Sequence, residues 1–112
     1  MKLRWELHFK KDQHLKVLKK LCRKLKVEPV NTTFDLSGHP GKRSLAAFDV
    51  ELKSTSWKDA VAESLEIGAR ISPHWHLAMD PPKFIRCTTD QCGIDGIEIL
   101  GWHLHLEQIA PD

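Results

Sequence analysis

The amino-acid sequence predicts a single α+β domain, residues 1–112, in which two helices cover one face of an antiparallel sheet. Two observations lead to this prediction. Segments in which apolar and polar residues alternate strictly surround two segments of helical periodicity, in the order strand, helix, strand, strand, helix and then further strands. The 112 residues are 41% hydrophobic and contain no internal repeat, so the chain is long enough to bury one core.

The first strand and the first helix are separated by a change of periodicity near residue 12. Residues 2–10 alternate, which puts Leu3, Trp5, Leu7 and Phe9 on one face of a half-buried strand. Asp12 can cap a following helix by accepting from the amides of its first turn. Pro29 ends that helix, because proline disfavours helical geometry in the preceding residue. Its apolar stripe is Leu15, Leu18, Leu21, Cys22 and Leu25.

The middle of the sequence predicts a hairpin and a second helix. Residues 30–36 and 45–53 alternate as strands, and the Gly/Pro-rich residues 37–42 between them form a turn. Ser56 and Asp59 make a capping box that starts a helix running to about Ile71. Its expected inner face is Trp57, Ala60, Val61, Ser64, Gly68 and Ile71.

Three further strands are expected in the last third, at 74–79, 84–88 and 97–107. The whole order is that of a ferredoxin-like, split β-α-β two-layer sandwich. Right-handed crossovers then place strand 2–10 in the middle, beside either 74–79 or 97–107. In both cases the helices cover the face that holds three tryptophans, Trp5, Trp75 and Trp102, and the opposite face stays open.

Two His-x-His pairs are the most distinctive chemical feature. Side chains two residues apart on a strand share a face, so the open face should carry five imidazoles: His8, His74, His76, His103 and His105. Backbone positions about 7 Å apart along a strand and about 5 Å apart across strands could bring three of them to one ion. The cluster therefore suggests a zinc site and a metal-dependent enzyme, with Glu6 or Glu107 nearby.

An alternative interpretation of the same face is a subunit interface. Ile97, Ile99 and Gly101 are expected beside His103 and His105, and exposed isoleucines on an open sheet favour association. The protein would then be a homo-oligomer. Its assembly would respond to pH, because protonation of clustered imidazoles inside an interface costs free energy.

The first helix concentrates positive charge. Residues 1–26 contain ten Lys and Arg against two acidic residues, a net charge of +8, whereas the other 86 residues carry −6. The arc opposite the leucine stripe holds six cations: Lys16, Lys19, Lys20, Arg23, Lys24 and Lys26. Such a stripe suits an acidic protein or the phosphates of a nucleic acid. The alternative is a solvated face whose charge is offset by the acidic outer face of the second helix.

The cysteines and the hydropathy of the chain limit its expected location and class. Cys22, Cys87 and Cys92 fit reduced thiols better than a disulfide framework, and no apolar run could span a bilayer. A cytoplasmic location is therefore expected. The sequence favours a small non-enzymatic interaction or regulatory domain that self-associates through its open sheet face and binds an acidic partner through the first helix. The two alternatives are the metal-dependent enzyme and a nucleic-acid-binding protein.

Overall fold

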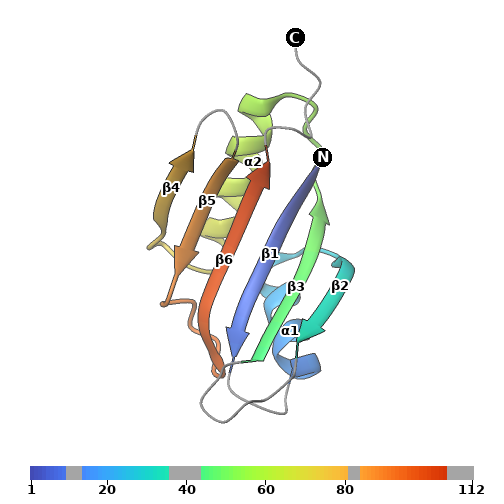
Figure 1. Cartoon of the computed structure of the whole chain (residues 1–112), viewed down its shortest axis with the longest axis vertical. Coiled ribbons are helices and arrows are strands. Elements are labelled where there is room, and N and C mark those ends of the chain that lie inside the picture. Colours follow the sequence, from blue (N-terminus) through green and yellow to red (C-terminus); the bar gives the residue numbers. More distant parts are fainter. Residues whose placement is uncertain (10–13, 36–43, 81–83, 106–112) are drawn as a thin grey trace.

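A computed structural model, which describes residues 1–9, 14–35, 44–80 and 84–105, confirms the α+β class. Within these residues one open antiparallel sheet of six strands is accompanied by two helices, and both helices lie behind the same face of the sheet (Figure 1). The elements are β1 (Lys2–Phe9), α1 (His14–Leu25), β2 (Val30–Asp35), β3 (Ser44–Glu51), α2 (Trp57–Ala69), β4 (His76–Asp80), β5 (Phe84–Thr89) and β6 (Ile97–His105).

The strand order is β2-β3-β1-β6-β5-β4. The neighbour of β1 is therefore β6, the later of the two candidates, and β4 forms the sheet edge. From that edge β5 and β6 return to the centre as an antiparallel meander. This topology establishes an α+β fold with one antiparallel sheet and two helices. The more specific ferredoxin-like, split β-α-β assignment stays a prediction.

A cluster of three tryptophans fills the space between the sheet and α2. Trp5 and Trp102 are fully buried on β1 and β6. Trp75 stands edge-on to both, with ring centroids 5.9 and 6.5 Å away. Its indole N–H donates to the carbonyls of Gly68 and Ser72, at 3.1 and 2.9 Å. The predicted tryptophan-rich core is confirmed.

The apolar stripe of α1 begins later than predicted. Leu15 is 56% exposed, whereas Val17, which was not among the predicted stripe residues, is buried. Because α1 begins at His14, Leu15 lies in its first turn. The rest of the stripe is buried as expected. The proposed Asp12 cap lies outside the described residues.

The C-terminus of α1 is closed by a Schellman motif before Pro29 is reached. Lys26 adopts a left-handed conformation with φ of 58°. Its amide donates to the carbonyl of Arg23, and the next amide, of Val27, donates to Cys22. These two bonds satisfy carbonyls that have no partner within the helix.

Helix α2 begins at its predicted cap, since the Ser56 hydroxyl accepts from the Asp59 amide at 3.2 Å. It ends at Ala69, earlier than the predicted end near Ile71. Ile67 is buried and was missing from the predicted inner face. Neither helix is long and apolar enough to cross a bilayer within the described part of the chain.

Two predictions about the last third are wrong in ways that affect the candidate site. Strand β4 starts at His76, so His74 lies before the strand. His74 and His76 therefore do not share one face of a strand, contrary to the prediction. The register between β1 and β6 shifts after His8 and pairs Phe9 with Ile97. Because Phe9 faces the core, Ile97 does too, and it is 9% exposed. The predicted turn 37–42 lies outside the described residues.

Candidate functional site

The uncovered face of the sheet is polar and is organised in rows across the strands. One row, from β1 through β6 to β5, reads Arg4, His103 and Arg86. The next row reads Glu6, Gly101 and Thr88, and His8 lies beside Ile99 in the third. Direct cross-strand neighbours have Cβ atoms about 5 Å apart, so these side chains can interact with one another.

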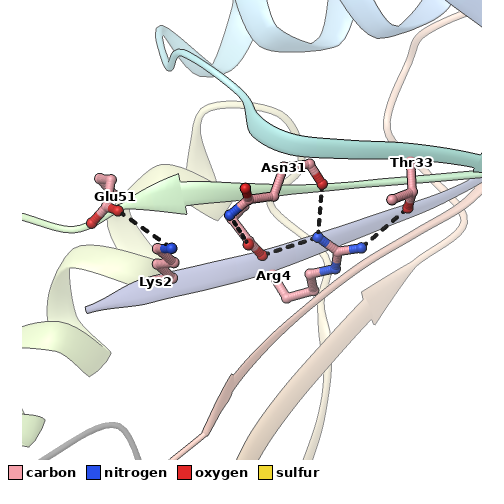
Figure 2. A network of polar contacts seen from close by, with 6 residues as sticks. Lys2, Arg4, Asn31, Thr33 and Glu51 are labelled. Atoms are coloured by element: carbon pink, nitrogen blue, oxygen red, sulfur yellow. Dashed lines mark hydrogen bonds and ion pairs between the residues drawn. The ribbon is translucent and has the colours of Figure 1, made fainter.

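Arg4 is held at the β2 side of this face by a local network (Figure 2). Its guanidinium donates to Asp49 Oδ1, to the Asn31 carbonyl and to the Thr33 hydroxyl, each at 3.2 Å. Asn31 has a positive φ of 52°, and its side-chain amide donates to the other oxygen of Asp49 at 3.0 Å. The charge of Arg4 is thus offset within the sheet.

Two imidazoles near the centre of the face have different surroundings. His8 Nε2 lies 3.2 Å from Glu6 Oε1 and is partly exposed. The ring of His103 lies edge-on to that of His105, with centroids 4.8 Å apart. Burial lowers the pKa of His103, and His105, Arg86 and Arg4 lower it further, while Glu6 opposes them. His103 is consequently biased towards its neutral form.

The structure does not assemble the predicted five-histidine metal site. His8, His103 and His105 lie on the open face, and so does His76, which pairs with Thr88 on β5. However, two strand spacings, or roughly 10 Å, separate His76 from β6. Among the residues that the structure describes, no three of His, Cys, Asp and Glu gather closely enough to hold a metal ion. The zinc site therefore stays a prediction for which the described residues supply no set of ligands. Glu107 lies outside the described residues.

The three cysteines are buried and unpaired. Burial raises the pKa of Cys22 and of Cys87 to about 11 in each case. Since the thiolate is the reactive form, both are protonated and unreactive near neutral pH. Cys22 belongs to the core stripe of α1, as predicted.

The basic face of α1, defined as Lys16, Lys19, Lys20, Arg23, Lys24 and Lys26, is exposed along its whole length. Within the described ranges none of the six cations takes part in an ion pair. The helix His14–Leu25 contains no acidic residue. Three pairs of like charge are spaced four residues apart, Lys16–Lys20, Lys19–Arg23 and Lys20–Lys24, and such pairs destabilise a helix.

Within the described ranges the acidic side of α2 forms no ion pair with this face. Glu63 accepts hydrogen bonds from the amides of Lys53 and Ser54 and from the Ser54 hydroxyl, the last at 2.6 Å. Burial alone would raise the pKa of Glu63, but these bonds outweigh it and lower the pKa. Glu66 pairs with Arg70 on its own helix, at 3.8 Å. Neither carboxylate forms an ion pair with the basic face, although Glu63 and Glu66 line one hollow together with Lys26.

Two hollows border the basic face along residues 15–24, and a third, of about 710 Å³, is lined by Lys26 together with acidic residues that include Asp59, Glu63 and Glu66. One of the first two, of about 450 Å³, lies along the helix and is lined by the exposed Leu15 and by four cations of the basic face. The other, of about 340 Å³, is lined by Lys20, Arg23 and Lys24 together with the loop residues Gly93, Ile94 and Asp95. The surface thus combines unpaired positive charge with accessible apolar atoms.

Comparisons with protein families, with curated proteins and with solved structures find no significant match to this chain.

Proposed function

We propose that the protein is a non-enzymatic binding module that docks an acidic protein surface on the basic face of α1. The observation that carries this proposal is the exposure of six like-charged side chains that have no ion-pair partner in the described residues. Their mutual repulsion costs the free protein stability, and a negatively charged partner would remove that cost.

An acidic protein suits the surface better than a nucleic acid does. Leu15 is 56% exposed beside the cations and can serve as an apolar contact, which a phosphate backbone would not use. Single-stranded nucleic acids are usually held by aromatic side chains that stack on bases. Two of the four tryptophans, Trp5 and Trp102, are fully buried and cannot stack, and Trp75 is partly buried and packs against them.

The test is fluorescence anisotropy with four labelled probes: a peptide of Glu with interspersed Leu, a Glu-only peptide, a generic DNA duplex and a single-stranded RNA. Wild-type protein should bind the Glu/Leu peptide most tightly, and affinity should fall as salt is added. Lys19→Glu/Arg23→Glu should weaken that binding by about tenfold or more. Leu15→Ser should weaken binding of the Glu/Leu peptide and leave binding of the Glu-only peptide unchanged.

Lys58→Glu is the single-site control, because Lys58 is an exposed lysine on α2, away from the basic face. It should bind every probe as the wild type does. Tighter binding of the DNA or RNA than of either peptide would replace the acidic-protein assignment with the nucleic-acid alternative. Equal binding by the double variant and the wild type would remove the basic face from the function altogether.

Self-association through the open sheet face is a second candidate. Ile99 and Phe84 are only partly buried there, which favours it, whereas the inward turn of Ile97 removes one apolar side chain from the predicted interface. Sedimentation at about pH 5.5 and about pH 8 tests it, since a histidine-lined interface should weaken at the lower pH. A monomer at both values would dismiss the candidate.

A further inference from the structure

The centre of the open sheet face is hollowed at Gly101, on the side of the sheet opposite the helices. Glycine has no side chain, so its place in the grid of outward-facing residues is empty. The hollow, of about 60 Å³, is lined by residues that include Glu6, His8, Arg86, Thr88, Gly101 and His103. Pockets for drug-sized ligands measure about 300–1,000 Å³, so this one fits a small group only.

The polar groups around the hollow are mostly hydrogen-bond donors. Arg86 is exposed and forms no hydrogen bond or ion pair in the described part of the chain, so its guanidinium donors are available. His103 is its direct cross-strand neighbour and can donate from its ring, and the Thr88 hydroxyl lies one row away on the same strand as Arg86. A guanidinium presents a planar fork of N–H groups that matches the oxygens of phosphate or carboxylate.

The other charged groups at this place have close contacts of their own. Arg4, on the far side of His103, is bound by Asp49. The Glu6 carboxylate also lines the hollow, and its Oε1 lies 3.2 Å from His8 Nε2. Arg86 is thus the one lining cation that lacks a counter-charge among the described residues.

We propose that the hollow over Gly101 binds a small tetrahedral oxyanion, the phosphate group of a monoester, between the Arg86 guanidinium and the His103 ring. Protonated His103 is the form that attracts the anion, so binding and protonation favour each other. By linkage, each raises the affinity for the other by the same factor. The affinity for a given ionisation state of the phosphate should therefore rise as the pH falls through the titration of His103, whereas protonation of the monoester, with a second pKa of about 6, acts in the opposite direction.

The charged groups that face His103 set the size of this effect. Arg4 on β1 and Arg86 on β5 oppose its protonation, as does His105 on its own strand, while Glu6 on β1 favours it. A bound phosphate neutralises the cations that oppose protonation. The pKa of His103 should therefore rise towards its ordinary value when phosphate is bound.

The test is an NMR titration of the histidine rings with inorganic phosphate, with sodium chloride at matched ionic strength as the reference and with acetate as a carboxylate probe. Phosphate should shift the His103 signal to saturation and raise its pKa, and acetate should do so more weakly. Arg86→Gln should weaken the phosphate affinity by about tenfold. Lys2→Gln, which removes a cation of the same face outside the hollow, should leave the affinity unchanged.

Gly101→Ala tests the hollow itself while both anion-binding groups remain. A Cβ there would lie 3.3 Å from the Cys87 carbonyl oxygen and from the Thr88 methyl, a tight contact that requires these neighbours to move by a few tenths of an ångström. The variant should fold, as tryptophan fluorescence would show, and should bind phosphate less tightly. A His103 response that chloride reproduces, or that persists unchanged in Arg86→Gln, would overturn the proposal. Because Lys19→Glu/Arg23→Glu leaves this face intact, the outcome is independent of the function proposed for α1.

Discussion

Replacing Lys20 with glutamate should make the free protein more stable, although the residue is exposed and touches no part of the core. Lys20 lies four residues from Lys16 and four from Lys24, and all three are cations on one helix face. The substitution removes two like-charge pairs and creates two opposite-charge pairs. At about 0.2–0.5 kcal/mol for each of these four changes, the sum is about 0.8–2 kcal/mol of added stability. Lysine and glutamate have similar helix propensities, so the backbone contributes little.

Urea denaturation at low salt measures this gain. With a slope of about 1–3 kcal/mol per molar urea, the midpoint should rise by roughly 0.3–2 M. Lys20→Gln, which removes the repulsions without adding attractions, should give about half the gain. In about 1 M salt the Debye length is about 3 Å and the gain should nearly vanish. Unchanged or lower stability of Lys20→Glu at low salt would refute the argument that the basic face is self-repelling.

Three other substitutions test the fold that supports this face. Lys26→Gly should raise stability by about 1 kcal/mol in a thermal melt, because glycine adopts the left-handed conformation of the α1 terminus without strain. Gly68→Ala should lower the stability measured in urea by about 1 kcal/mol. The new Cβ would lie 3.1 Å from Trp102 Nε1, and this crowding exceeds the gain in helix propensity. A stabilised variant would show that the tryptophan rings can move aside. Glu63→Gln should cost about 1–2 kcal/mol at pH 7 through weaker bonds to Ser54 and its neighbours. The folded pKa of Glu63 lies below its ordinary 4.5, so this difference should be complete above that value and disappear as the pH falls through the folded pKa; a difference that is constant with pH would contradict the assignment.

The local pattern of the sequence predicted most elements because burial on one face imposes a period on each segment. The alternation in β1 and the cap at Ser56 are both as expected. Leu15 was misplaced because periodicity alone does not say where along a helix the contact with the sheet begins. The buried Ile67 could have been found by extending the α2 stripe from Ser64 by three residues, a helical spacing that the sequence already displays.

The strand order and the register determine which side chains lie side by side on the open face. Both depend on contacts between segments that are distant in the sequence. Nothing local distinguishes β4 from β6 as the neighbour of β1. The shift after His8, which turns Ile97 inward, is likewise a property of the pairing and not of either strand. The exposed cations of α1 were predictable, because an exposed helix face is set by the helix itself. The hollow over Gly101 was not, since it requires the register of three strands.

The central claim, that the basic face of α1 is the docking surface, is tested most directly by one ratio. It is the dissociation constant of Lys20→Glu divided by that of Lys58→Glu for the Glu/Leu peptide at about 0.05 M salt, where the Debye length exceeds 10 Å. The two variants have the same net charge and differ in which helix face carries the change. We expect a ratio of about ten or more, with Lys20→Glu the more stable protein of the two. A ratio near one would mean that the peptide responds to net charge alone, and the basic face would then be only a solvated surface.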